Sequence, residues 1–306
     1  MVTGAAGFIG SHYVDYVLEN HPEDHVIGFD CLTYAGNMNN LELAIPNKRF
    51  EFVNGDIRNP DEVDSVVAKV DAIVNFAAET HVDRSIASSS EFVSTNVLGV
   101  NVLLEAAIKH KISIYHQIST DEVYGSVEFG YSLESDKLAP RSPYAASKAA
   151  ADLLVESFRI THDLNTRITR ASNNYGTRQY PEKLIPFFIS RLLKGEKVPV
   201  YGTGENVRDW LHVADHVHAI DLVFRNNNLS NIFNVSGDNL KTNLEITELI
   251  LGIIGLNKTY IEFVDDRKGH DFRYALDGSK ILKTYNFKPK GDLETELVKL
   301  ISSSVN

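Results

Sequence analysis

Three glycines near the start of the chain constrain its fold more than any other feature. Gly4, Gly7 and Gly10 stand between a short apolar segment and an amphipathic stretch with helical spacing. Such a junction allows a tight turn, lets backbone approach a pyrophosphate, and lets the helix pack closely on the strand. The pattern therefore predicts a dinucleotide site at the first strand–helix junction of a parallel sheet.

An acidic residue at the end of the second predicted strand indicates which dinucleotide is bound. Asp30 follows Gly10 by 20 residues. A carboxylate at this place accepts hydrogen bonds from ribose hydroxyls and repels a 2′-phosphate. We therefore expect NAD, not NADP. The alternative is a glycine-rich turn and a strand-terminal aspartate without a cofactor.

Strand-like and helical segments alternate through the first half of the chain. Apolar strand-like runs occupy residues 2–3, 25–30, 50–54, 72–76, 113–119 and 166–170. Helical patterns occupy residues 8–20, 61–69, 90–110 and 144–162. This alternation predicts an α/β fold, a Rossmann doubly wound parallel sheet, to which residues 232–235 could return as a late strand. Only Met1, Val2 and Thr3 precede the glycines, so the first strand is short unless residues precede Met1.

The second half of the chain lacks this alternation. Residues 181–195 and 244–256 have helical spacing, the latter capped by Thr242 or Asn243, and residues 198–212 resemble strand and loop. We find no linker, so the second domain should be woven from segments of this half. The prediction is an NAD-binding domain of residues 1–174 plus 211–236, beside a smaller, interwoven C-terminal substrate domain of residues 175–210 plus 237–306.

Charge and cysteine content exclude several classes of partner. The chain has 30 Lys and Arg against 41 Asp and Glu, a net charge of −11. Nucleic acid and anionic membrane surfaces are therefore not expected as partners. No apolar run approaches the roughly 20 residues of a membrane helix, and no metal is expected. Cys31 is the only cysteine, which fits a reducing, cytoplasmic location.

A tyrosine and a lysine lie one helical turn apart after the fifth predicted strand. Tyr144 precedes Lys148 by four residues, so both share a helix face. The ammonium can lower the pKa of the phenol and hold the nicotinamide ribose. The tyrosinate can then take a proton from a carbinol while hydride leaves for NAD. The alternative is a surface pair without chemistry.

Thr120, Asp121 and Glu122 follow directly at the carboxyl end of that fifth strand. Ligands of open α/β sheets bind at this edge. Two adjacent carboxyl groups can take opposite roles when their surroundings separate their pKa values. One can protonate a leaving hydroxyl while the other removes a carbon-bound proton. The sequence thus predicts that one site carries out both oxidation and dehydration. The alternative is that these residues cap a loop, with the side chains of Asp121 and Glu122 in solvent.

With these motifs the chain resembles the extended short-chain dehydrogenases/reductases and, more narrowly, the dTDP-glucose 4,6-dehydratases. The triplet Thr120–Glu122 is the most specific element, because related 4-epimerases generally lack the carboxylate pair here. The resemblance runs along nearly the whole chain and rests on residues 4–11, 30–37, 77–85, 119–125, 142–148, 172–176, 181–186 and 208–210.

The resemblance implies a reaction in three linked steps. Tyr144, assisted by Thr120, deprotonates the sugar 4-hydroxyl as hydride passes from C4 to NAD. Glu122 then removes the C5 proton while Asp121 protonates the departing C6 hydroxyl. Hydride finally returns to C6, giving a 4-keto-6-deoxy nucleotide sugar. The cofactor must stay bound between the two transfers.

The resemblance also implies contacts, residue by residue. Cofactor contacts are expected at Gly4, Gly7, Phe8, Ile9, Gly10, Asp30, Cys31, Leu32, Thr33, Asp56, Ile57, Phe76, Ala77, Ala78, Thr80, Thr95, Tyr144, Lys148 and Asn174. Substrate contacts are expected at Thr80, Thr120, Asn173, Lys183, Leu184, Pro199, Val200, Tyr201, Arg208, Asn243, Arg267 and His270. Arg208 should meet the diphosphate, unless it pairs with Asp209. Lys268 stands where relatives usually have proline, which makes the shape of its loop an open point.

A homodimer is the assembly that the resemblance implies. Its interface would use the helices predicted at residues 90–110 and 144–162, whose apolar residues are Val97, Val100, Leu104, Leu153 and Leu154. The same side chains could instead face the sheet.

Three other functions stay open from the sequence. The first is a 4,6-dehydratase for UDP-glucose or another nucleotide sugar, since the residues that select the base are not legible. The second is a 4-epimerase, in which Asp121 and Glu122 would have no duty. The third is a non-catalytic dinucleotide sensor or scaffold, which would be expected to lose Tyr144, Lys148 or Glu122.

Overall fold

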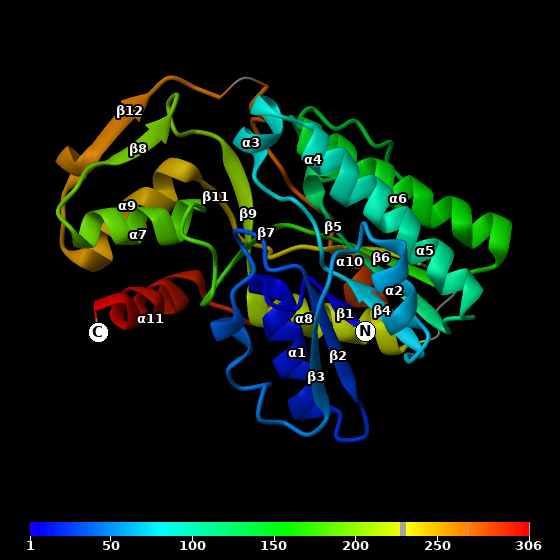
Figure 1. Ribbon diagram of the computed structural model, residues 1–306. Coiled ribbons are helices and arrows are strands. Elements are labelled where there is room, and N and C mark those ends of the chain that lie inside the picture. Colours follow the sequence, from blue (N-terminus) through cyan, green and yellow to red (C-terminus); the bar gives the residue numbers. More distant parts are fainter. Residues whose placement is uncertain (227–230, 268, 306) are drawn as a thin grey trace.

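A seven-stranded parallel sheet forms the centre of the computed structural model, which describes residues 1–226, 231–267 and 269–305 (Figure 1). The strands lie in the order β10-β6-β5-β4-β1-β2-β3. Their bounds are β1 (Val2–Thr3), β2 (Val26–Asp30), β3 (Phe50–Asn54), β4 (Ala72–Asn75), β5 (Ile114–Thr120), β6 (Thr166–Ala171) and β10 (Ile232–Val235). The order reverses between β1 and β4, which confirms the predicted doubly wound sheet, including its late strand.

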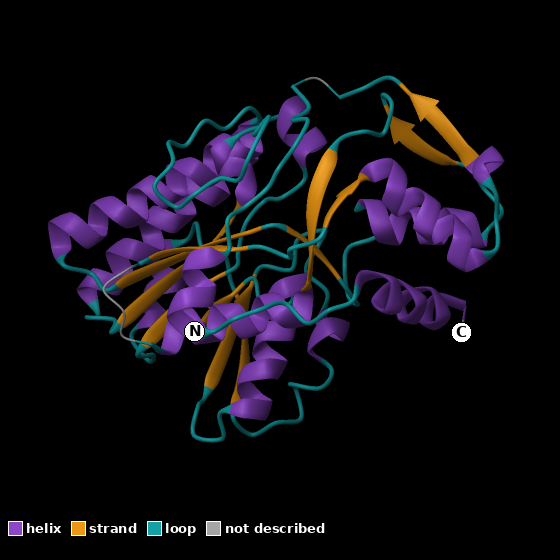
Figure 2. Ribbon diagram, turned by 180° about the vertical axis from the view of Figure 1, so that it is seen from behind, coloured by secondary structure: helices purple, strands orange, loops and turns teal. Residues whose placement is uncertain are grey.

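Helices cover both faces of this sheet, as the view from behind also shows (Figure 2). α1 (Phe8–Asn20) and α8 (Val213–Arg225) pack on one face, where Val14, Val74 and Ile118 meet in one core. The other face carries α2 (Pro60–Val67), α5 (Val100–Lys109) and α6 (Pro143–His162), around Ile73 and Tyr115. Neighbouring residues of a strand point to opposite faces, so β2 and β4, which are covered on both, appear in the sequence as short apolar runs, whereas β5 and β6 also bury polar side chains.

One long helical stretch departs from the sequence prediction. α4 (Ser90–Val93), a π-helical segment (Ser94–Gly99) and α5 follow one another without a break. By length and composition alone these 20 residues could span a membrane, so the prediction that no run approaches that length was wrong. Within the stretch Val100, Leu103 and Leu104 are at most 1% exposed and lie in the sheet core. Packing on the sheet therefore accounts for its apolar face.

The C-terminal half builds two small sheets and a second core. One sheet has the order β11-β9-β7, with β7 (Asn173–Tyr175), β9 (Val207–His212) and β11 (Leu240–Thr242); the other pairs β8 (Val198–Tyr201) with β12 (Ile261–Val264). α7 (Leu184–Leu193), α9 (Asn243–Ile254) and α11 (Leu293–Val305) pack together around a core of their own. This separate core supports the two-domain division, which we keep as a proposal.

Local signals explain where the two predicted helices of this half begin. Thr242 caps α9: its hydroxyl accepts from the Glu245 N–H at 3.0 Å, and the Glu245 carboxylate accepts from the Thr242 N–H at 2.7 Å. This reciprocal capping box selects Thr242 over Asn243. α7 begins at Leu184, three residues after the predicted start, because the N–H of Lys183 closes a turn onto Tyr180. The remaining short helices are η1 (Met38–Leu41), α3 (Val82–Ala87), η3 (Asp121–Tyr124), η4 (Lys258–Tyr260) and α10 (Ser279–Tyr285).

Candidate active site

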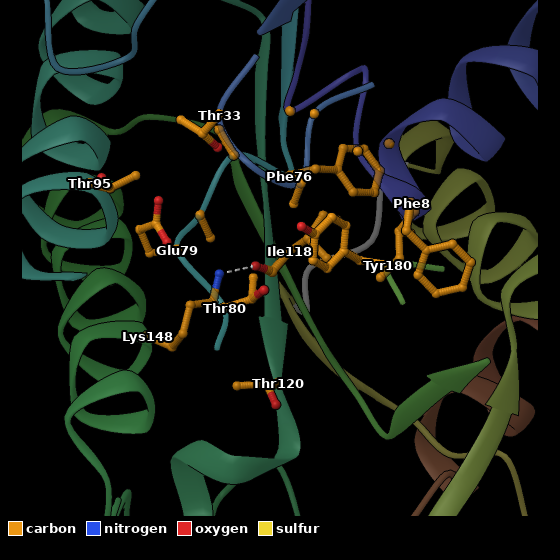
Figure 3. A pocket seen from close by; sticks show the side chains of 18 of the residues that line it. Phe8, Thr33, Phe76, Glu79, Thr80, Thr95, Ile118, Thr120, Lys148 and Tyr180 are labelled. Carbon is orange, nitrogen blue, oxygen red and sulfur yellow. Dashed lines mark hydrogen bonds between the residues drawn. The ribbon is translucent and has the colours of Figure 1, made fainter. Parts of the chain in front are cut away.

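A cavity of about 340 Å³ opens at the carboxyl edge of the central sheet, where the strand order reverses. It is lined by the glycine loop, by the segments after β2, β3, β4 and β6, and by the start of α6. Figure 3 shows Phe8 and Tyr180 facing Thr95, Glu79 and Lys148 across this space. The cavity thus lies where a doubly wound sheet binds its ligand.

The glycine loop has the shape that a pyrophosphate requires. Gly4 has a φ of +62°, and a Cβ there would lie 2.8 Å from the backbone nitrogen of Ala77. A Cβ on Gly10 would collide with the carbonyl of Gly4. Gly7 caps α1 without a side chain, so the first N–H groups of the helix remain available to an anion. The residues present therefore fit a dinucleotide.

Asp30 is held with its carboxylate at the end of β2. One oxygen accepts from the N–H of Ala6 at 2.9 Å and the other from the N–H of Leu32 at 2.8 Å. Burial raises the pKa of this carboxyl group, and these two hydrogen bonds oppose the rise. Each carboxylate oxygen keeps a second lone pair. Those lone pairs can accept from ribose hydroxyls.

Most predicted cofactor contacts line this cavity, and Leu32 is the exception. Around it are Gly4, Gly7, Phe8, Ile9, Gly10, Asp30, Cys31, Thr33, Asp56, Ile57, Phe76, Ala77, Ala78, Thr80, Thr95, Tyr144, Lys148 and Asn174. Leu32 is not among the lining residues; it has a φ of +52°, and its side chain is 36% exposed. Leu32 stays a predicted contact, and the structure shows that its backbone N–H fixes Asp30.

Several lining residues escaped the sequence analysis. The guanidinium of Arg58 donates three hydrogen bonds of 2.6–3.0 Å to the carboxylate of Asp56. Asp56, a predicted cofactor contact, therefore has a cation next to it. His216 pairs with the side-chain oxygen of Asn174 at 2.8 Å and so orients that amide. Glu79 and Tyr180 also line the cavity. Arg58 follows two predicted contacts, Glu79 lies inside the 77–85 segment, and Tyr180 precedes the 181–186 segment, whereas His216 had no signal in the sequence.

The start of α6 places the tyrosine–lysine pair. The Ser142 hydroxyl accepts from the Ala145 N–H at 3.1 Å, and Pro143 opens the first turn, in which Tyr144 lies. Lys148 lies one turn further and donates from Nζ to the Ile118 carbonyl at 2.6 Å (Figure 3). Tyr144 is 8% exposed and Lys148 5%. Both groups are therefore fixed beside the end of β5.

The pKa of Tyr144 departs from the sequence prediction. Burial, and then the carboxyl groups of Glu122 and Asp121, raise it well above its ordinary value, while a hydrogen bond with Thr120 lowers it. The spacing with Lys148 predicted a lowered pKa, and for the protein alone that prediction is wrong. Burial and the two carboxyl groups dominate the pKa of the phenol, and the ammonium of Lys148 donates to a backbone carbonyl.

The carboxyl groups of Asp121 and Glu122 have different surroundings. Asp121 is 3% exposed, and burial followed by the charge of Glu122 raises its pKa well above the usual range. Burial also raises the pKa of Glu122, but Arg208, Lys183 and Arg267 oppose the rise. Asp121 is thus the better proton donor and Glu122 the better base. A loop cap in solvent is excluded, because both line the cavity.

The predicted substrate residues fall into two groups. Thr80, Thr120, Asn173 and Lys183 line the cavity. Lys183 donates to the Thr80 carbonyl at 3.2 Å, and the buried side-chain oxygen of Asn173 has no partner among the described residues. The other predicted residues do not line it: Leu184, Pro199, Val200, Tyr201, Arg208, Asn243, Arg267 and His270.

Arg208 and Arg267 form a cationic region next to the carboxylates. Arg208 is 7% exposed, donates to the Asp271 carbonyl at 3.0 Å and lies 3.1 Å from the His270 ring nitrogen. Arg267 bonds Asp83 at 2.6 Å and lies over the Tyr201 ring. Both cations act on Glu122. Arg208 does not pair with Asp209, whose carboxylate instead accepts from Ser172, Ser236, Gly237 and Asn239.

Val200 is a predicted substrate contact that the structure contradicts. Its side chain is 2% exposed and packs in the C-terminal core. Alternate residues of a strand face opposite sides, so Pro199 and Tyr201 point away from the core where Val200 points into it. The prediction about Lys268 lies outside the described residues.

The predicted dimer helices also require a correction. Val100 and Leu104 are at most 1% exposed and face the sheet core, so they cannot contact a partner. Leu153 is 62% exposed on α6, and Val93, Leu98 and Ile160 are exposed as well. The apolar surface of these helices is therefore made largely of residues other than those predicted.

Tyr34, Arg84, Tyr180 and Glu182 form a cluster that we call the clasp. The Arg84 guanidinium lies 3.9 Å from the Tyr34 ring centroid and 3.2 Å from the Glu182 carboxylate. The rings of Tyr34 and Tyr180 lie 5.4 Å apart, edge to face. The clasp thus joins the segments after β2 and before α7, both of which line the cavity.

Replacing Arg84 with Met should speed NAD dissociation about tenfold, because a cation–π contact and a partly exposed ion pair together stabilise by about 1–1.5 kcal/mol. The dissociation rate can be followed by displacement of bound NAD with excess labelled NAD. Arg159→Met, which removes a surface ion pair with Glu156, is the matched control and should change nothing. Equal rates for both variants would contradict a role for the clasp.

Comparison with known proteins gives full-length matches. A family model described as GDP-mannose 4,6 dehydratase matches residues 1–300. The low-salt glycan biosynthesis protein Agl12 of Haloferax volcanii is 52% identical over 97% of this chain and 95% of its own length. A dTDP-glucose 4,6-dehydratase of an Actinoplanes species is 46% identical over 99% of this chain and 96% of its own.

Solved structures agree with these matches. DesIV of Streptomyces venezuelae, a dTDP-glucose 4,6-dehydratase crystallised with NAD and TYD bound, superposes with a TM-score of 0.96. It is 46% identical, and the superposition covers 98% of this chain and 95% of DesIV.

Proposed function

Because the chain belongs to the GDP-mannose 4,6 dehydratase family and, within it, to the dTDP-glucose 4,6-dehydratases, we propose that it converts dTDP-glucose to dTDP-4-keto-6-deoxy-glucose and water. It is an NAD-dependent lyase. When bound, NAD accepts a hydride from C4 of the sugar and returns it to C6. The chain itself supplies the groups that move protons and hold the sugar.

Tyr144 starts the reaction by taking the proton of the 4-hydroxyl. Thr120 shares a hydrogen bond with this phenol and so fixes where it points. The charge of Lys148 must offset the two neighbouring carboxyl groups that hold the phenol's pKa high. Tyr144, Thr120 and Lys148 therefore act in the oxidation of C4.

Glu122 and Asp121 carry out the elimination. The 4-ketone makes the C5 proton acidic, and Glu122, beside three cations, takes it. Asp121, whose pKa burial and the charge of Glu122 raise, is the group suited to give a proton to the departing C6 hydroxyl. The C5 proton thus goes to Glu122, and the hydroxyl leaves as water with the proton of Asp121. When C6 regains the hydride, Glu122 gives a proton, exchanged with solvent, back to C5.

The acid pair beside Tyr144, in which Asp121 is buried and Glu122 is half-buried, is the observation that carries this proposal. A 4-epimerase oxidises and reduces the same carbon and needs no acid or base for C5 and C6. A non-catalytic dinucleotide sensor has no reason to bury Asp121 at 3% exposure next to Glu122. A dehydratase gives each of these groups a task.

The nucleotide is supported by the relatives. Several relatives 46–48% identical to this chain are named dTDP-glucose 4,6-dehydratases. Arg208 and Arg267, the cations outside the sugar cavity, suit a diphosphate. The contacts proposed here for Tyr201, Asn243 and His270 belong to the same nucleotide end of the substrate.

Mass spectrometry of dTDP-glucose incubated with the enzyme and catalytic NAD tests the proposal. The expected product is lighter than the substrate by one water. An unchanged mass with conversion to dTDP-galactose would replace the proposal with an epimerase. Turnover of UDP-glucose in preference to dTDP-glucose would correct the nucleotide and leave the reaction type in place.

We also propose a cytoplasmic homodimer. The exposed apolar side chains Val93, Leu98, Leu153 and Ile160 lie on α4, the π-helical segment and α6, which pack against one another. A second copy of the chain is the partner that would cover them. The single cysteine suits a reducing compartment.

A further inference from the structure

A buried ion pair lies one helical turn beyond Lys148. Asp152 follows Lys148 by four residues on α6, so the two side chains share a helix face. Asp152 is 1% exposed, and its carboxylate accepts from Nε of Arg170 on β6 at 2.9 Å. Arg170 is 3% exposed. The carboxylate of Asp152 and the guanidinium of Arg170 are thus both buried, and the carboxylate lies one helical turn after Lys148 of the active site.

Arg170 is fixed by further contacts. Its Nη1 donates to the Tyr124 hydroxyl at 2.8 Å, and its guanidinium lies 4.9 Å from the Tyr124 ring centroid. The Tyr124 hydroxyl in turn donates to the side-chain oxygen of Asn234 on β10 at 2.8 Å. The network therefore ties the carboxylate of Asp152 to η3, β6 and β10.

Lys148 needs such a carboxylate. Its ammonium is buried and donates to a single carbonyl, that of Ile118. A buried ammonium without a counter-charge loses its proton. Burial lowers the pKa of Lys148 to about 8, and Asp152 is the group that opposes this fall.

Other charged groups surround α6, but none takes this place. From η3, Asp121 and Glu122 act on Tyr144. The remaining titratable or charged groups of the packed elements are Tyr115 and His116 on β5, Tyr124 on η3, Glu79 after β4, Arg167 and Arg170 on β6, and Asp83, Arg84, Glu91, Glu105, Lys109 and His110 on or directly after α3, α4 and α5. On this helix face Tyr144 lies one turn before Lys148 and Asp152 one turn after it, so among the described residues Asp152 is the acidic group on α6 within one turn of Lys148.

We propose that Asp152 is a positioning residue that keeps Lys148 in its ammonium form, and that Arg170 holds the Asp152 carboxylate ionised and in place for this task. The inference rests on the proposed function, since Lys148 acts there on Tyr144 and the cofactor. Burial raises the pKa of Asp152, and Arg170 and Lys148 both oppose that rise. The pair therefore keeps the carboxylate charged where burial would neutralise it.

The test is the pH profile of kcat/KM for dTDP-glucose in Asp152→Asn. Asp152 raises the pKa of Lys148, so its removal should lower that pKa and move the basic limb of the profile to lower pH by about one unit or more. At pH values above the basic limb of the wild type, kcat/KM of Asp152→Asn should be about tenfold lower than that of the wild type. In mild acid the two values of kcat/KM should be nearly equal. A loss that is the same at every pH would overturn the proposal and leave Asp152 a merely structural residue.

Three further variants complete the experiment. Asp152→Glu keeps the charge and should keep the limb near its wild-type position. Arg170→Gln should move the limb in the same direction as Asp152→Asn, which keeps the proposal testable if the latter does not fold. Glu156→Gln, one turn further along α6 and paired with Arg159, should leave the limb unchanged. A wild-type enzyme without dehydratase activity would refute the proposed function instead, so the two failures are distinct.

Discussion

Replacing Tyr144 with Phe should abolish the first chemical step. The phenol is the group placed to take the proton of the 4-hydroxyl, and a positioned acid–base group contributes about 10²–10⁴-fold in rate. C4 oxidation should slow by about that factor, and the absorbance of the reduced nicotinamide should not appear when dTDP-glucose is added. Stopped-flow absorbance under single-turnover conditions measures this directly.

Tyr131→Phe is the matched control for that variant. Tyr131 is 54% exposed and lies on a surface loop, so its hydroxyl should be dispensable. Reduction of the cofactor at the wild-type rate in Tyr144→Phe would remove Tyr144 from the mechanism. NAD binding should be nearly unchanged in both variants, which separates a chemical defect from a binding defect.

Glu122→Gln should stop the reaction one step later. The amide has nearly the shape of the carboxylate but cannot take the C5 proton, so dehydration should slow by about 10²–10⁴-fold. C4 oxidation precedes this step and does not need Glu122. Reduced cofactor and a 4-keto-glucose nucleotide should therefore accumulate on the enzyme or partition back to substrate.

Absorbance together with mass spectrometry of quenched samples checks this result. Glu128→Gln, on an exposed loop, should behave as wild type. Normal dehydration by Glu122→Gln would show that another group is the base. Tyr144→Phe should block oxidation and Glu122→Gln should block elimination. A 4-epimerase has no elimination step, so it would not show this difference between the two variants.

The central sheet was predictable because of how it is buried. Helices cover both of its faces, so β2 and β4 appear in the sequence as short runs of apolar residues between helical patterns. The glycine loop, Asp30 and the Tyr144–Lys148 pair could also be predicted from the sequence, because their geometry depends on residues that are near one another in the chain. Local rules were sufficient there.

Other parts depended on contacts between distant segments. Within the apolar residues 90–109, Val100, Leu103 and Leu104 are explained by the sheet that they cover. Val200 was a substrate contact implied by the resemblance, yet strand alternation turns its side chain into the core. The raised pKa of Tyr144 comes from burial and from Asp121 and Glu122, whose charges the spacing with Lys148 could not reveal.

The buried partners of the site were the least predictable. Asp152 and Arg170 are 18 residues apart in sequence and meet only because α6 packs on β6. His216 reaches Asn174 from α8 across 42 residues. Such pairs carry no local signature, and only the fold brings them together.

The most direct test of the proposed mechanism is the fate of deuterium placed at C4 of dTDP-glucose. If one site oxidises C4, eliminates water and returns the same hydride, the label should appear at C6 of the 4-keto-6-deoxy product, with solvent hydrogen at C5. NMR of the isolated product reads both positions. Label retained at C4, or lost to solvent without reaching C6, would contradict the proposed sequence of steps.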